Sequence, residues 1–159
     1  MDELLALLEK NSTRQPAQIA AMLGISEEET IRRIKAFEED GTILGYGAII
    51  NEDKVDTGVV RAAIEVRLTP ERGGGFDRMA ARIARHDEVL SCYLMSGGYD
   101  LLVIVEHEDL KKVASFVAEK LSTIQGVVST STHFMLKTYK FNNVLMTQEQ
   151  NEDRLPVTP

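Results

Sequence analysis

Five consecutive residues, Ser96-Gly97-Gly98-Tyr99-Asp100, combine groups that can hold a small zwitterionic molecule. Glycines leave backbone N–H groups open to a ligand carboxylate, and the side chain of Asp100 can accept hydrogen bonds from an ammonium group. Both chemistries together are those that a free amino acid requires. A Gly-Gly pair also suits a tight turn between two strands, because glycine tolerates positive φ, so a purely structural interpretation stays open.

Hydroxyl side chains follow one another in a later segment of the chain. They belong to Ser129, Thr130, Ser131 and Thr132. These hydroxyls can add hydrogen bonds to the same ligand, or they can be ordinary residues of a strand.

A second candidate site is a basic helix face near the N-terminus. Arg32, Arg33 and Lys35 lie on the polar face of one expected helix, and Arg14 lies in the loop before the preceding helix. A guanidinium group can fork onto O6 and N7 of guanine, and a lysine can contact a phosphate. This face predicts binding to double-stranded DNA.

Acidic residues weaken that prediction. Residues 1–50 contain nine acidic and five basic side chains, a net charge of −4, and the run Glu27–Glu29 stands where phosphates would approach. Charged helix faces are often only solvated surface. A three-helix interaction module that does not bind DNA therefore stays open as an alternative.

Composition narrows the other classes of function. The chain has 159 residues, a formal net charge of −7 and one cysteine, Cys92, which excludes an intrachain disulfide and fits a reducing cytoplasm. The three histidines (His86, His107 and His133) are far apart, so we expect no metal and no cofactor. No apolar run approaches the ~18 residues of a membrane span, and the acidic start, Asp2-Glu3, is unlike a secretory signal. We expect a cytoplasmic protein without a membrane partner.

Helical periodicity and caps organise the first forty residues. They predict a helix around residues 4–8, a second from Pro16 to Gly24, and a third that Gly41 ends. Two helices joined by a short turn containing glycine form a helix-turn-helix motif. Thr42–Ile50 is predicted as a β-hairpin around two glycines, the wing of the motif.

The third helix is the expected recognition helix. Ser26 and Glu29 have the spacing of a capping box, in which each side chain bonds the other residue's backbone N–H. Ile31, Ile34 and Phe37, spaced three apart, are expected to be buried. The DNA-binding candidates are Arg14, Ser26, Arg32, Arg33 and Lys35.

The remaining residues predict a separate sensing domain. Residues 51–58 are a polar linker, residues 59–141 alternate strands and helices in the order βαββαβ, and residues 142–159 are expected to form an extra edge strand and a tail. The predicted strands are 60–68, 89–95, 101–105 and 127–139, and the predicted helices are 76–83 and 110–121. The whole chain is therefore α+β, with a winged helix-turn-helix over residues 1–50 and a ferredoxin-like sheet after it.

One strand of this sheet is apolar on both faces. The segment Leu101–Val105 contains only apolar residues, and continuously apolar strands are typically buried on both faces. Because both helices cover the same face, the other face needs a partner. A second copy of the chain is the simplest one, and a homodimer would also present two recognition helices to a near-palindromic DNA site.

Several segments together resemble the Lrp/AsnC family of feast/famine regulators. The resemblance covers about residues 2–141 and is carried by both halves of the chain in the same order. The matching segments are Ile19-Ala20, Leu23-Gly24-Ile25-Ser26, Arg33-Ile34, Phe37-Glu38, Gly41-Thr42-Ile43, Gly45-Tyr46, Val89–Asp100, Leu121, Gly126-Val127, Thr130 and Thr132. The run Glu27–Glu29 is more acidic than is typical of the family.

The resemblance implies a transcription regulator with a C-terminal RAM-type sensing domain. It implies homodimers that assemble to tetramers or octamers, and a small effector, usually an amino acid, bound between subunits near Gly97–Asp100. The effector-binding candidates are Gly97, Gly98, Tyr99, Asp100, Thr130 and Thr132. We expect no enzymatic activity.

Two other readings of the sequence stay open. An amino-acid-sensing, oligomerising protein with weak or no DNA binding would share the same sensing domain. An enzyme similar to the two-domain haem-pathway decarboxylases would need a pocket of histidines and arginines, and His86, His107 and His133 have no obvious cluster of basic neighbours.

Overall fold

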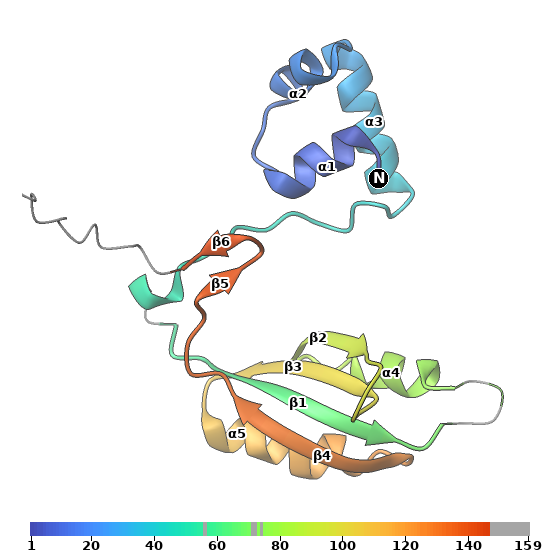
Figure 1. Ribbon diagram of the computed structural model, residues 1–159, viewed down its shortest axis with the longest axis vertical. Helices are drawn as coiled ribbons and strands as arrows, with labels where there is room; N and C mark the ends of the chain where they lie inside the picture. Colours follow the sequence, from blue (N-terminus) through green and yellow to red (C-terminus); the bar gives the residue numbers. More distant parts are fainter. Residues whose placement is uncertain (56, 71–72, 74, 147–159) are drawn as a thin grey trace, which may run out of the picture. The chain divides into compact units, whose positions relative to one another are not determined.

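The computed structural model describes residues 1–55, 57–70, Gly73 and 75–146 (Figure 1). Contacts within the chain divide it into two compact units, Met1–Ile50 and Asn51–Pro159. No helix in the described ranges is long and apolar enough to cross a membrane.

The first unit contains three helices, α1 (Glu3–Lys10), α2 (Pro16–Leu23) and α3 (Glu27–Glu39). The Asp2 side chain caps α1 by accepting the N–H of Leu4 at 2.8 Å. Gly24 ends α2 with φ of 68°, a left-handed conformation that glycine adopts without strain. The helices enclose one apolar core made of Leu4, Leu8 and Ile19, with Leu7, Leu23, Ile34, Phe37 and Ile43 packed against it.

The inner face of α3 differs from the predicted one. Ile34 and Phe37 pack against the core, but Ile31 is 49% exposed, and Thr30 is fully buried in its place. A spacing of three drifts off one helix face, because an α-helix has 3.6 residues per turn. Thr30, Ile34 and Phe37 follow the i, i+4, i+7 pattern of a buried stripe.

The hairpin predicted over Thr42–Ile50 is wrong, because no strand forms in this segment. Its start is held by Ile43, whose N–H donates to the carbonyl of Phe37 at 2.8 Å. Leu44, Tyr46 and Ile50 are then each more than half exposed, so the segment packs little of its apolar surface against its own unit. An isolated two-stranded hairpin is marginal without such packing, and neither glycine of the segment adopts the positive φ of a tight hairpin turn.

The second unit contains a four-stranded antiparallel sheet with the βαββαβ order predicted from the sequence. Its strands are β1 (Val60–Leu68), β2 (Val89–Leu94), β3 (Leu101–His107) and β4 (Val127–Phe134), in the spatial order β2-β3-β1-β4. This is the strand order of a ferredoxin-like fold. A short 3₁₀ helix, η1 (Glu52–Lys54), precedes the sheet.

Helices α4 (Asp77–Ile83) and α5 (Leu110–Ser115) cover one face of this sheet, and α5 continues as a π-helix, η2 (Phe116–Leu121). The inward residues of β1, β3 and the helices form one core. It consists of Ala62, Ile64, Val66, Leu68, Met79, Ile83, Leu101, Val103, Val105, Val113, Phe116, Leu121 and Ile124. The helices predicted over 76–83 and 110–121 are thereby confirmed, although Leu110 at the start of α5 stays 54% exposed.

The chain after the sheet departs from the prediction. β4 ends at Phe134, and the next strands, β5 (Lys140–Phe141) and β6 (Val144–Leu145), pair with each other instead of adding an edge strand to the main sheet. Asn142 and Asn143 supply the positive φ of this tight turn, at 43° and 65°. The N–H of the Asn51 side chain holds the hairpin's end by donating to the carbonyl of Met146 at 2.8 Å. The predicted tail over residues 147–159 lies outside the described residues.

Gly126 is required where the chain enters β4. Its φ is 99°, and an added Cβ would lie 2.5 Å from Sδ of Met79, a buried residue of α4. We therefore expect Gly126→Ala to lower the free energy of unfolding by about 2 kcal/mol, because both backbone strain and overpacking oppose it. Urea unfolding of the full chain measures the loss.

Gly98→Ala is a matched control for this substitution. A Cβ at Gly98 meets no atom within 4 Å, and its φ is not positive, so its midpoint should stay close to that of the wild type. Equal midpoints for the two variants would contradict the role given to Gly126.

Candidate DNA-binding face and effector site

The exposed face of α3 carries two of the predicted DNA-binding side chains. Arg32 and Lys35 are 74% and 71% exposed. Arg32 pairs with Glu29, and Nζ of Lys35 lies 3.6 Å from Oε1 of Glu39. Exposed ion pairs of this kind contribute little to stability. Both cations can therefore exchange these partners for DNA.

Ser26 is the N-cap of α3. Its Oγ accepts the N–H of Glu29 at 3.1 Å. The side chain of Glu29 bonds Arg32 rather than the backbone of Ser26, so only half of the predicted capping box forms.

The other two predicted DNA-binding residues hold the helices of the unit together. Nη2 of Arg33 lies 2.6 Å from Oδ2 of Asp2, which ties α3 to the start of α1. Partial burial acts to raise the pKa of Asp2, but the N–H of Leu4 and the charge of Arg33 outweigh it and keep that pKa below its ordinary value. Nη1 of Arg14 donates to the carbonyl of Leu7 at 2.8 Å, which satisfies a backbone group at the end of α1.

The structure adds Ile31 to the exposed face of α3. This side chain lies one residue before Arg32 and one helical turn before Lys35, and about half of it is exposed. An aliphatic side chain in that position can contact the methyl group of thymine. Sequence periodicity alone missed it, because any isoleucine in an amphipathic helix is first assigned to the core.

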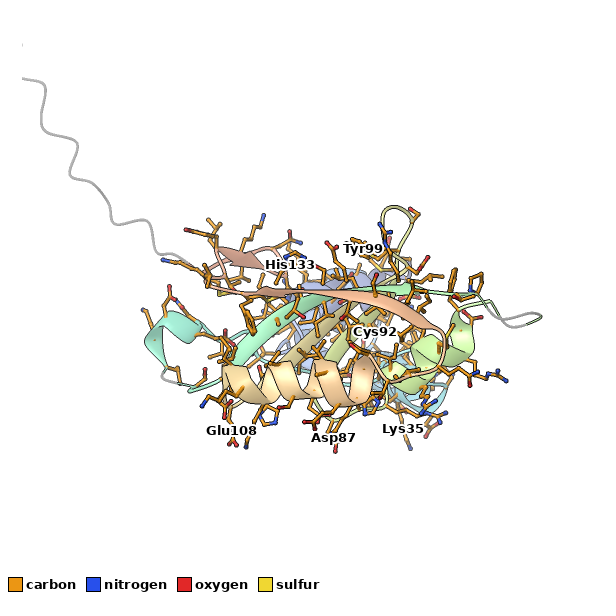
Figure 2. All side chains as sticks on the ribbon, turned by 90° about the horizontal axis from the view of Figure 1, so that it is seen from below. Lys35, Asp87, Cys92, Tyr99, Glu108 and His133 are labelled. Carbon is orange, nitrogen blue, oxygen red and sulfur yellow. The ribbon has the colours of Figure 1, made fainter. Side chains whose placement is uncertain are left out.

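The loop between β2 and β3 is longer than a two-residue turn. It spans residues 95–100 and rises from the sheet on the side opposite α5, with Tyr99 at its base (Figure 2). The N–H of Met95 donates to the carbonyl of Asp100 at 2.8 Å, and the N–H of Asp100 donates to the carbonyl of Val66 at 3.0 Å. Between these bonds, Gly97 and Gly98 are exposed, and a Cβ added to either glycine would meet no atom within 4 Å. Their backbone is therefore open to a ligand.

Asp100 fixes this loop to the neighbouring strand. Its Oδ2 accepts the N–H of Leu68, the last residue of β1, at 2.7 Å. The half-buried carboxylate retains further acceptor capacity, because each carboxylate has two oxygens and about four lone pairs. Asp100 can therefore hold the loop and still accept a hydrogen bond from a ligand.

The predicted threonines lie on the other face of the sheet from this loop. Thr130 and Thr132 stand opposite Val66 and Ile64 in the β1–β4 register, so their side chains share the helix-covered face. Oγ1 of Thr130 lies 3.4 Å from the hydroxyl of Ser122. The structure therefore does not bring the threonines together with residues 97–100.

Ser129 and Ser131 lie on the loop's side of the sheet. They stand opposite Arg67 and Glu65 of β1, whose side chains alternate with the buried ones. Both serines are exposed. Because side chains alternate along a strand, the sequence allowed either the two serines or the two threonines to share the loop's side of the sheet. Only the register of β4 against β1 shows that it is the serines.

The sheet face opposite the helices carries apolar side chains at its centre. Leu102 and Ile104 of β3 stand opposite Glu65 and Ala63 and remain partly exposed. The other residues of the strand, Leu101, Val103 and Val105, are buried under the helices. Among the described residues of the second unit, no α-helix covers this face (Figure 2).

Two family models match this arrangement. A winged helix-turn-helix DNA-binding model matches residues 3–43, and the Lrp/AsnC ligand binding domain matches residues 61–145. The first match covers the three helices, and the second covers the sheet with its loop at residues 95–100. Together they define a DNA-binding transcriptional regulator with an effector-binding domain.

Relatives and solved structures agree with both matches. The uncharacterized HTH-type transcriptional regulator YugG of Bacillus subtilis (strain 168) is 44% identical over 158 residues, which is 99% of this chain and 95% of that protein. The proline dehydrogenase transcriptional activator of Rhodobacter capsulatus is 31% identical over 121 residues, 76% of this chain and 77% of that one. A crystal structure of a transcriptional regulator of Neisseria meningitidis in complex with L-Met has a TM-score of 0.65 and 25% identity, and covers 89% of this chain and 93% of its own.

The chain belongs to the Lrp/AsnC family of transcriptional regulators. The family and the fold predicted from the sequence are thereby confirmed. The matched domains and relatives are those of a regulator and not of an enzyme.

Proposed function

We propose that this regulator binds operator DNA as a homodimer in the cytoplasm and that a free amino acid, bound at the loop of residues 95–100, changes its DNA affinity or assembly. The observation that carries the DNA half is the outward face of α3. Arg32 and Lys35 contact bases and phosphates there, and Ile31 contacts thymine methyl groups. Arg14, Arg33 and Ser26 act by holding the helices and the start of α3 in place.

The dimer is formed by the sheet face around Leu102 and Ile104. A partly exposed apolar centre on a sheet with one uncovered face supports this choice. Charged residues surround it, among them Arg61, which pairs with Glu106 at 2.6 Å on its own chain. Such dimers then assemble in twos or fours into the tetramers or octamers expected from the family.

The effector is held by the backbone of Gly97 and Gly98 and by the carboxylate of Asp100. The backbone N–H groups bind the carboxylate of the amino acid, and Asp100 binds its ammonium group. Ser129 and Ser131, which share the loop's side of the sheet, are better placed to add hydroxyls than Thr130 and Thr132. The L-Met in the related structure from Neisseria meningitidis supports a ligand of this class.

A second candidate function is favoured by one observation, the exposed run Glu27–Glu29 at the start of α3. These carboxylates would repel phosphates at the end of the helix that usually enters the groove. The chain would then sense amino acids and oligomerise with weak or no DNA binding.

Selection of binding sites from a pool of randomised DNA duplexes tests the proposal against this alternative. The full chain should enrich one near-palindromic sequence, and its affinity for that sequence should fall steeply between about 50 and 200 mM salt, because bound phosphates release counterions. Recovery of only the random pool would favour the second candidate.

Asp100→Asn separates effector binding from folding. The amide oxygen can still accept the N–H of Leu68, but the negative charge that binds an ammonium group is lost. We expect the amino-acid effect on DNA binding to require about tenfold more ligand or to disappear, with unchanged affinity in its absence. Titration of the operator complex with amino acid measures this, and Asp87→Asn, at an exposed aspartate after α4, is the control.

A further inference from the structure

A row of arginines borders a cavity of about 450 Å³ that lies between α4 and the turn before β4. The arginines are Arg78, Arg82 and Arg85, and Met79, Ile124 and Gln125 complete most of the lining. Met79 and Ile124 are buried, so their side chains form an apolar floor beneath exposed guanidinium groups. This cavity lies outside the DNA-binding face and the effector loop.

The spacing of the three arginines places them on one side of α4 and its C-terminal extension. Positions 78, 82 and 85 follow the i, i+4, i+7 pattern of a single helix face. Like charges in this arrangement repel each other. A bound anion that contacts several of these guanidinium groups would remove this repulsion.

Several other basic residues of this unit have carboxylate partners. Arg61 pairs with Glu52 and Glu106, Lys112 with Glu108, and Lys120 with Glu88. In the described part of the chain, no carboxylate lies within ion-pair distance of Arg82 or Arg85. Two unpaired guanidinium groups beside one cavity are unexpected in a chain with a net charge of −7.

The nearby Glu88, in the turn before β2, does not supply a partner carboxylate for Arg82 or Arg85. The carboxylate of Glu88 bonds Nζ of Lys120, and this hydrogen bond lowers the pKa of Glu88. Glu88 therefore stays ionised and engaged with Lys120, and Arg82 and Arg85 remain available to an external anion.

We propose that this cavity binds a phosphate-bearing small molecule of the nucleotide class. Guanidinium groups present a planar fork that matches two phosphate oxygens at once, and arginine sheds its hydration more readily than lysine. The volume lies in the range of small-molecule sites. The apolar floor of Met79 and Ile124 fits a base, and the amide of Gln125 offers a donor and an acceptor. This site does not depend on the amino-acid effector proposed above.

Isothermal titration calorimetry of the full chain with ADP tests the proposal. Wild-type protein is expected to bind ADP, and adenosine, which lacks the phosphates, is expected not to bind. The double variant Arg82→Gln/Arg85→Gln should bind ADP about tenfold more weakly or worse, because two charge-assisted contacts are lost. Both side chains are exposed, so this variant should melt at the wild-type temperature.

Lys111→Gln/Lys140→Gln is the matched control, since it removes two exposed positive charges of the same unit away from the cavity. It should bind ADP within about twofold of wild type if the charge acts locally. The proposal is overturned if wild type does not bind ADP, if adenosine binds as well as ADP, or if both double variants weaken ADP equally. It is also overturned if Arg82→Gln/Arg85→Gln reduces only the affinity for unrelated duplex DNA, because the row would then contact the DNA backbone.

Discussion

Replacing both Arg32 and Lys35 with glutamine should weaken operator binding about 30-fold or more. The estimate corresponds to about 2 kcal/mol for the loss of one base contact and one phosphate contact. Both side chains are exposed and bonded only to glutamates of their own helix, so the fold should be retained. Fluorescence anisotropy with a labelled operator measures the change, and the dependence of affinity on salt should become shallower.

Lys111→Gln/Lys140→Gln removes the same charge from the sensing unit and serves as the control. Operator affinity of this control should stay within about twofold of wild type, because exposed charges act over roughly one Debye length. Equal losses in the two double variants would mean that net charge, and not the face of α3, determines DNA binding.

Ile104→Glu should convert the proposed homodimer to a monomer. The substituted carboxylate would be tolerated on the partly exposed sheet face of one chain, but a dimer through this face would bury it without a partner. We expect the dimer dissociation constant to rise about 100-fold or more, which corresponds to roughly 3 kcal/mol. Sedimentation equilibrium measures it.

Ile104→Val keeps the face apolar and should leave the dimer intact. Operator affinity should fall with Ile104→Glu and not with Ile104→Val, since only a dimer presents two α3 helices to one site. A dimer that survives Ile104→Glu would place the interface elsewhere on the chain.

Local rules predicted most of the fold. Gly24 and Ser26 located the turn between α2 and α3. Glycine is favoured at the left-handed position that ends a helix, and serine is favoured as the N-cap that begins one. The alternation of β1 predicted its buried side from the sequence, since successive side chains of a strand point to opposite faces.

Tertiary contacts decided what local rules could not. Arg33 and Arg14 were predicted to contact DNA because arginine is a common DNA-contacting residue. Once the helices pack, however, Arg33 bonds Asp2 and Arg14 bonds the carbonyl of Leu7. The same holds for Thr130, whose side of the sheet depends on the register of β4 with β1. A one-residue change of that register would have placed it beside the loop.

The strand ends were also set by contacts distant in sequence. β-propensity extends the last strand toward Tyr139, but the register with β1 ends at Ala62 and Phe134, and only the N–H of Met135 bonds further, to the carbonyl of Arg61 at 2.9 Å. The following chain forms its own hairpin of β5 and β6 instead.

The central claim, a DNA-binding regulator tuned by an amino acid, is tested most directly by one titration. Anisotropy of the selected operator with the full chain is measured with each of the common L-amino acids in turn. We expect the operator to bind more tightly than unrelated DNA, in a salt-dependent manner, and its affinity to shift by about fivefold or more with one or a few amino acids. Binding no tighter than to unrelated DNA at low salt, with or without any amino acid, would contradict it.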